Sequence, residues 1–139
     1  MENWIIRKIE KKDNQVVAKL IRAVFDELNI PKEGTAYADP YLDLMFEEYN
    51  KPQSVYFVVE SKGEIIGGAG VAPLENEAET ICELQKMYFL PEARGLGIGS
   101  QMMDVCLKSA KDFGFEKCYL ETMPFMHDAQ KLYKKVGFD

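Results

Sequence analysis

Residues 91–100, PEARGLGIGS, place glycines at positions 95, 97 and 99, between a segment typical of a β-strand and a segment typical of a helix. The preceding segment, TICELQKMYFL, is apolar and aromatic, as expected of a strand. Glycine costs conformational entropy on folding, so this density indicates a backbone that something approaches closely. The apolar residues that follow recur at helical spacing: Ile98, Met102, Cys106, Ala110 and Phe113. A helix that begins in such a turn has unpaired N–H groups and a positive dipole end, which together predict an anion site.

The rest of the chain predicts the order β-α-α-β-β-β-α-β-α. Asp13 and the pair Asp39-Pro40 are start signals for the first two helices, and Lys62-Gly63 is typical of a hairpin turn. Gly114 is expected to end the helix that follows the glycine turn. Because a strand–helix–strand crossover follows a meander, we expect an α/β fold with a mixed, mostly antiparallel central sheet and helices on both faces. The predicted strands are 4–9, 54–61, 64–74, 80–90 and 117–122, and the last helix is 126–137.

Length and composition limit the class of protein. The 139 residues are typical of a single domain, here 1–139, and the net charge of −6 argues against a nucleic-acid partner. No apolar run reaches the ~18 residues that span a bilayer, and the charged N-terminus does not resemble a signal peptide. We therefore expect a cytoplasmic protein without a membrane partner. The three cysteines include no CxxC pair, which predicts reduced thiols in or near the core and no metal site.

The glycine pattern excludes two familiar phosphate sites. A Walker loop requires a lysine after its last glycine, and none follows here. A dinucleotide fingerprint requires a third glycine where this chain has Ser100 or Met102. What remains is Arg94-x-x-Gly97-x-Gly99, a pattern short enough to be a plain turn and helix start.

Two motifs together resemble the GCN5-related N-acetyltransferase (GNAT) superfamily. LQKMYFLPEARGLGIGSQMM is similar to the acetyl-CoA loop of that family, and AQKLYKKVGF to its A-x-x-x-Y-x-x-x-G-F helix, so the resemblance covers about residues 55–138. It implies the acyl-CoA N-acyltransferase fold and transfer of an acetyl group from acetyl-CoA to a small-molecule or peptide amine. The backbone of Met87 and Phe89 would pair with the pantetheine arm. The loop residues implied in pyrophosphate binding are Arg94, Gly95, Leu96, Gly97, Ile98, Gly99 and Ser100.

Two side chains are candidates for proton transfer. Glu83 is expected on the same face of its strand as Met87 and Phe89, and the resemblance implies that it acts as general base. It could equally be a solvated or salt-bridged glutamate beside Lys86. Tyr133, on the inner face of the last helix, corresponds to a tyrosine that protonates the leaving thiolate in the family. The alternative for Tyr133 is an amphipathic core tyrosine.

The chain departs from the family at its end. It stops at GFD, where family members continue into a final strand, so the fold is expected to lack that strand and to leave the edge of strand 117–122 open, unless a homodimer supplies the strand. The acceptor would lie over the first two helices and the loop after Leu74. It would be lined by residues that could equally be solvated: Glu33, Tyr37, Asp39 and Tyr41. Two other functions stay open, namely a non-catalytic acyl-CoA-binding or sensing module and a nucleotide-binding regulatory domain.

Overall fold

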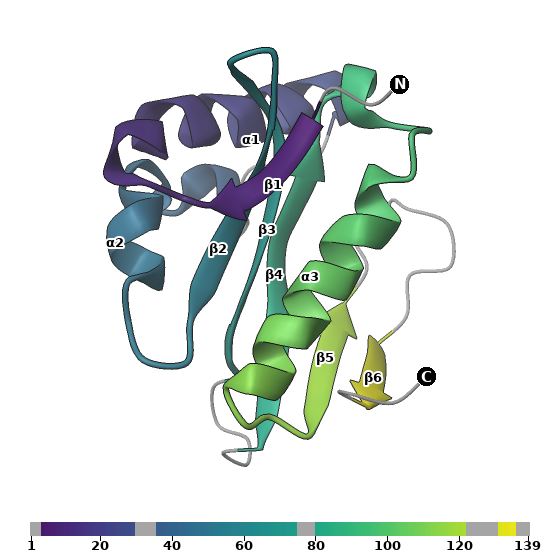
Figure 1. The fold of residues 1–139 in the computed structure, drawn as a ribbon. Helices are drawn as coiled ribbons and strands as arrows, with labels where there is room; N and C mark the ends of the chain where they lie inside the picture. The colour runs from purple at the N-terminus through teal and green to yellow at the C-terminus, as the bar shows by residue number, and fades with distance from the viewer. Residues whose placement is uncertain (1–3, 30–35, 75–79, 122–130, 136–139) are drawn as a thin grey trace.

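Six strands form one mixed sheet between helices on its two faces (Figure 1). The computed structural model describes residues 4–29, 36–74, 80–121 and 131–135. In these residues the strands lie in space in their sequence order, and each pair is antiparallel except β4–β5. The strands are β1 (Trp4–Lys8), β2 (Val55–Ser61), β3 (Glu64–Pro73), β4 (Ile81–Phe89), β5 (Lys117–Glu121) and β6 (Lys131–Lys135). The helices are α1 (Asn14–Leu28), α2 (Met45–Tyr49) and α3 (Ile98–Asp112), with short 3-10 turns at Lys11–Asp13, Ala36–Ala38, Leu42–Leu44 and Pro91–Ala93.

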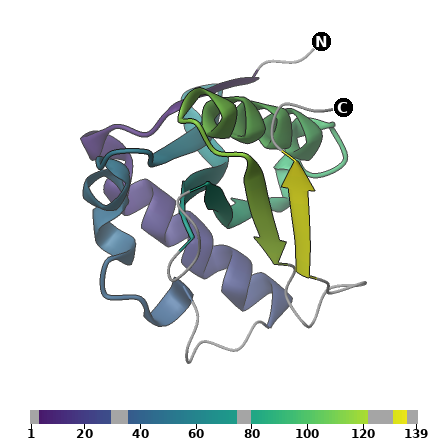
Figure 2. The ribbon, with the colours of Figure 1, turned by 90° about the horizontal axis from the view of Figure 1, so that it is seen from below.

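The molecule has three layers, with the sheet between two layers of helices, as the view from below shows (Figure 2). Helices α1 and α2 cover one face of the sheet, and α3 covers the other. The apolar run of β2 supplies both cores, because successive side chains of a strand point to opposite faces. Tyr56 and Val58 pack with Ile21 and Phe25, whereas Phe57 and Val59 pack with the α3 side. The predicted fold class, an α/β sheet with helices on both faces, is confirmed.

Glycines in β3 make room for aromatic side chains of neighbouring strands. A Cβ at Gly70 would lie 2.6 Å from the carbonyl oxygen of Val55 and 2.7 Å from Cδ1 of Tyr56. A Cβ at Gly68 would lie 2.7 Å from the Tyr56 hydroxyl oxygen. At Gly68 and Gly70 the group that comes close to the backbone is therefore the packed side chain of Tyr56.

A β-bulge in β4 exchanges the two faces of that strand. Gly70 is registered with Gln85 and Gly68 with Tyr88, so two residues of β4, Lys86 and Met87, lie opposite Ala69. Lys86 has a φ of 48°, in the left-handed region, and its carbonyl accepts a 2.7 Å hydrogen bond from the Tyr56 hydroxyl.

The bulge corrects one prediction from the sequence. Before the bulge, Leu84 packs on the α3 side of the sheet. Gln85 points to the opposite face, where it bonds to Tyr49 of α2. Glu83, two positions earlier and bonded to Gln85, lies on that same face. After the bulge, Met87 and Phe89 pack on the α3 side. The expectation that Glu83 shares a face with Met87 and Phe89 is wrong, because the extra residue shifts the alternation by one position.

The helix predicted over 126–137 is also wrong where the structure describes it. Lys131–Lys135 form β6, which pairs antiparallel with β5 and places Tyr133 opposite Tyr119. The outer edge of β5 carries N–H and C=O groups that need partners, and this pairing outweighs the helical periodicity of the segment. The edge that we expected to stay open is therefore paired with this chain's own residues. The remaining positions of the predicted helix lie outside the described residues.

We expect Gly70→Ala to lower the free energy of unfolding by about 2 kcal/mol, because the added methyl group overlaps the Val55 carbonyl and the Tyr56 ring. Urea denaturation measures the change. Gly63→Asn is the control, because position 63 has a φ of +80° with nothing within 4 Å of an added Cβ, and asparagine tolerates that conformation. Equal stability of Gly70→Ala and the wild type would show that the strands adjust without strain.

Candidate functional site

The sheet opens between β4 and β5. Their parallel pairing covers Ile81, Cys82 and Glu83 on β4 and then stops, although β4 continues to Phe89. The Leu90 N–H donates to the Ile66 carbonyl of β3 over 2.9 Å, so by alternation the backbone groups of Phe89 and Met87 point to the opposite edge. That edge is where the resemblance places the pantetheine arm, and in the described residues no strand pairs with it. Glu83 lies at the point where the two strands separate.

The glycine turn forms an open cradle at the start of α3. Gly95 and Gly97 have φ values of +80° and +78°, and a Cβ built on either one meets nothing within 4 Å. Helix α3 begins at Ile98, so the amide groups of Ile98, Gly99 and Ser100 have no carbonyl partner one turn earlier in the helix. The Leu96 side chain is 53% exposed beside this space. The turn therefore fits a phosphate group, which needs free N–H donors and no side chain in its path.

Arg94 fastens the cradle to two other elements. Its Nη1 and Nη2 each donate to the Glu27 carboxylate of α1 over 2.8 Å, and Nη2 and Nε donate to the Phe89 carbonyl over 2.8 and 3.2 Å. Hydrogen bonding from Arg94 lowers the pKa of the Glu27 carboxyl. The guanidinium thus holds the end of β4, the glycine turn and the C-terminal part of α1 in one arrangement.

Glu83 is held by a chain of hydrogen bonds on the α2 side of the sheet. The Tyr49 hydroxyl donates to Gln85 Oε1 over 2.6 Å, and Gln85 Nε2 donates to Glu83 Oε1 over 2.8 Å. Burial, and then the negative charge of Glu83, raise the pKa of Tyr49, so the phenol stays protonated and remains a donor. The second carboxylate oxygen of Glu83 is not engaged by these bonds.

The register of the sheet brings the two predicted proton-transfer residues into one row. Glu83 is paired with Tyr119 of β5, and Tyr119 is paired with Tyr133 of β6. Two strand spacings separate the backbones of Glu83 and Tyr133 by roughly 10 Å. The Tyr133 backbone therefore lies in the same row of the sheet as Glu83, although on a strand and not on a helix.

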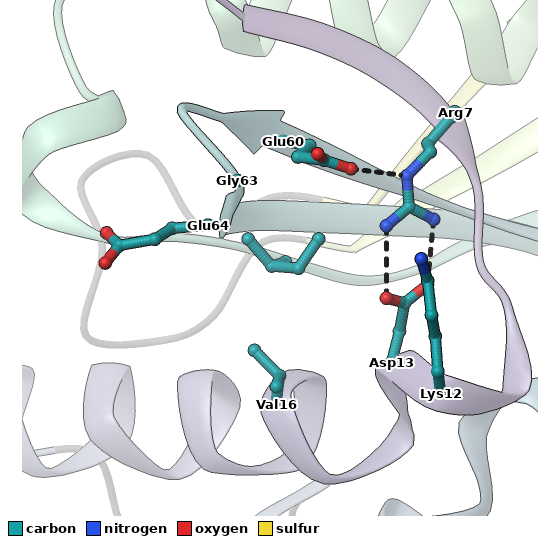
Figure 3. A pocket seen from close by; sticks show the side chains of 8 residues that line it. Arg7, Lys12, Asp13, Val16, Glu60, Gly63 and Glu64 are labelled. Atoms are coloured by element: carbon teal, nitrogen blue, oxygen red, sulfur yellow. Dashed lines mark hydrogen bonds and ion pairs between the residues drawn. The ribbon is translucent and has the colours of Figure 1, made fainter.

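A pocket elsewhere on the surface has a different character (Figure 3). It lies at the β1 edge of the sheet and is built around Arg7, whose Nε donates to Glu60 over 2.8 Å and whose Nη1 donates to Asp13 over 2.8 Å. Burial would raise the pKa of Asp13, but hydrogen bonds from Arg7 and from the Glu10 amide lower it. The guanidinium is satisfied by its own carboxylates, so this network stabilises the start of α1.

The described residues contain no candidate metal site, and their cysteines are buried. No three His, Cys, Asp or Glu side chains of that part gather in a way that could hold a metal ion. Cys82, Cys106 and Cys118 are buried reduced thiols, as the sequence predicts. Burial raises the pKa of Cys106 to about 12, which leaves its thiol unreactive at neutral pH. No helix in the same residues has both the length and the apolar character to cross a membrane.

Four residues near the site were not identified from the sequence as site residues. Glu27 and Tyr49 lie on helices far from β4 in the chain, and Gln85 shows no motif. One sequence feature pointed to an irregularity at Lys86, namely the imperfect alternation of apolar residues in its strand. Glu33, which we expected near the acceptor, and the loop directly after Leu74 lie outside the described residues.

Comparison with known sequences gives one family. The sequence profile of the acetyltransferase (GNAT) family matches residues 21–138. The uncharacterized N-acetyltransferase YjgM of Escherichia coli is 41% identical over 136 residues, which cover 97% of this chain and 81% of the relative. Human N-acetyltransferase 8B is 29% identical over 114 residues, covering 77% of this chain but only 50% of the relative.

Solved structures share the fold. A GNAT family acetyltransferase from Brucella melitensis, in complex with acetyl-CoA, superposes with a TM-score of 0.74 at 20% identity and covers all of this chain and 92% of its own. A GNAT family acetyltransferase from Staphylococcus aureus gives a TM-score of 0.76 at 20% identity, covering 88% of this chain and 74% of its own. At these identities the likeness concerns the fold alone.

Tyr49→Phe tests the hydrogen-bond chain that holds Glu83. We expect a loss of about 1 kcal/mol in the free energy of unfolding, because Gln85 Oε1 loses its donor in a part-buried place. Urea denaturation measures it, with Tyr41→Phe as the control, since the Tyr41 side chain is 52% exposed. Unchanged stability of Tyr49→Phe would mean that this bond does not hold the network in solution.

Proposed function

The chain belongs to the acetyltransferase (GNAT) family, and on that premise we propose that it transfers the acetyl group of acetyl-CoA to a primary amine, with Glu83 as general base and Tyr133 as general acid. The activity itself, that of an acetyl-CoA-dependent N-acetyltransferase, follows from the family. One observation carries the assignment of the base: Glu83 lies where β4 and β5 separate, on the strand that leads into the glycine turn.

The residues present fit acetyl-CoA. The turn from Gly95 to Ser100 offers free amides and space for a pyrophosphate, and the unpaired edge of β4 offers the backbone groups of Met87 and Phe89. The Phe89 carbonyl already accepts from Arg94, so its N–H is the group left for a ligand. When bound, acetyl-CoA supplies a thioester, whose carbonyl carbon is open to attack by an amine.

Glu83 is suited to remove the proton that blocks this attack. A primary amine at neutral pH is mainly ammonium and has no lone pair to donate. The Glu83 carboxylate takes that proton directly or through one water, after which the amine nitrogen bonds to the carbonyl carbon. Gln85 holds one carboxylate oxygen, which leaves the other oriented for the proton.

Bond breaking needs a proton at the sulfur. When the tetrahedral intermediate collapses, the C–S bond breaks and the new C–N bond is kept. The electron pair of the C–S bond leaves with the thiolate of coenzyme A. The Tyr133 phenol is our candidate to donate the proton that makes the free thiol. Its support is the family resemblance together with the row that joins its backbone to Tyr119 and Glu83.

Gly97→Ala tests the cradle. We expect the affinity for coenzyme A to fall at least about tenfold, because the new methyl group enters the space that a phosphate would occupy. Isothermal titration calorimetry measures it. Gly114→Ala is the matched control: it has a φ of +94° and open space, so it carries the same backbone cost at the other end of α3. Equal affinities in the two variants would remove the glycine turn from the binding site.

Glu83→Gln and Tyr133→Phe test the proton transfers. Each is expected to lower kcat by about 10²–10⁴-fold while the affinity for coenzyme A stays within about twofold, since neither group binds the coenzyme. Glu116→Gln, at an exposed position, is the control. A full rate in either variant would refute the role of that residue. Coenzyme binding without acetylation of any amine by the wild type would favour the non-catalytic acyl-CoA-binding or sensing module.

A further inference from the structure

Lys86 is a strained residue beside the proposed base. It is one of few non-glycine residues of the described chain with a positive φ, at 48°. A lysine has no local hydrogen bond to offset the left-handed conformation, which costs roughly 1–2 kcal/mol. Such strain persists only where the surroundings impose it, and it is found often at functional sites. Here the bulge opposite Ala69 and the Tyr56 hydroxyl impose it.

The ammonium of Lys86 is only loosely paired. Its Nζ lies 3.5 Å from Asp39 Oδ2, longer than the 2.7–2.9 Å of a strong charged hydrogen bond. Its other described neighbour is the Tyr49 ring, with the centroid 5.9 Å away. The side chain is 22% exposed, so the charge is partly withdrawn from water. Since an ammonium has three donors, most of its bonding capacity is open to a ligand.

Asp39 is fixed independently of Lys86. Its Oδ1 accepts a 2.8 Å hydrogen bond from the Tyr41 amide. The carboxylate would therefore keep its place if the lysine turned to another anion. The lysine can exchange one carboxylate for another without a rearrangement of the fold.

The surroundings as a whole suit a molecule with charges of both signs. Glu83 and Lys86 lie three positions apart on β4, and both lie near the Tyr49 phenol. Carboxylates at Glu83, Glu48 and Asp39 all raise the pKa of that phenol, after the larger effect of burial. An ammonium group is attracted to these acids. Glu48 is already paired with Lys51 over 3.1 Å, and Lys86 is the cation beside Asp39.

We propose that the acceptor is an amine that also carries a carboxylate, as amino acids and short peptides do, with the amine at Glu83 and the carboxylate at Lys86. This inference rests on the proposed function. It adds a specificity-determining residue, Lys86, and a substrate class. The acceptor carboxylate replaces Asp39 as the partner of the ammonium, at a shorter distance.

The test uses pairs of acceptors that differ only in the carboxylate: glycine, β-alanine, 4-aminobutyrate, 6-aminohexanoate and glycylglycine, each with its carboxamide. For each pair, the ratio of kcat/KM for the acid to that for the amide is measured with the wild type and with Lys86→Gln. Comparing the ratios between the two proteins cancels the different basicity of acid and amide. In the wild type at least one pair is expected to favour the acid, and Lys86→Gln is expected to lower that ratio about tenfold or more.

Two further variants separate recognition from structure. Lys86→Arg keeps the charge and is expected to keep the preference. Lys62→Gln also removes a lysine at a positive φ, 54°, in the β2–β3 turn, and is expected to leave the ratio unchanged. Asp39→Asn removes the competing carboxylate and is expected to lower KM for the acids.

Several outcomes overturn the proposal. The proposal is wrong if the wild type has no higher kcat/KM for any acid than for its amide. It is also wrong if Lys86→Gln lowers kcat/KM equally for acids and amides. Acetylation of amines with unchanged ratios refutes the role of Lys86 and leaves the proposed function intact. Coenzyme binding with no acetylation of any amine, including polyamines and aminoglycosides, refutes the proposed function and this inference with it.

Discussion

The backbone hydrogen bonding of β4 is the constraint on which the rest of this structure depends. Up to Glu83 the strand has a partner on each edge, and beyond Glu83 the part of the chain that the structure describes provides only β3. Buried backbone groups need partners, so a central strand that loses one neighbour is open to an extended ligand. The separation of β4 from β5, the glycine turn at the end of β4 and the start of α3 follow one another along the chain, and we propose that together they hold a long, partly anionic molecule.

Because of the bulge at Lys86, the side chains of β4 before and after it lie on opposite faces of the sheet. Past the bulge, Met87 and Phe89 pack against the α3 side and anchor the part of the strand that we propose to pair with the coenzyme. Before it, Glu83 and Gln85 face α2, where Tyr49 holds them in line. An even alternation would have placed all four residues on one side. The donor and acceptor groups would then compete for the same space.

Sequence reasoning succeeded where the signal is local. The glycine turn, the hairpin at Lys62-Gly63 and the strand and helix order as far as β5 depend on short-range backbone preferences, and all of them appear in the structure. It failed where pairing between distant segments decides. The bulge depends on β3 and on the Tyr56 hydroxyl, and β6 depends on the free edge of β5. In the same way, Tyr49 comes from a separate part of the chain, so no motif could indicate that it bonds to Gln85 beside Glu83.

By itself, the sequence determined the family of this protein and the position of the glycine turn before α3, and it pointed to Glu83 and Tyr133 as the residues that we propose for proton transfer. These follow from residue types at fixed spacing, which local backbone geometry converts directly into structure. Only the tertiary structure decided which face of β4 carries Glu83, what holds its carboxylate and which groups surround Lys86. Those features arise from contacts between residues far apart in the chain, and such contacts exist only once the sheet has paired and its helices have packed.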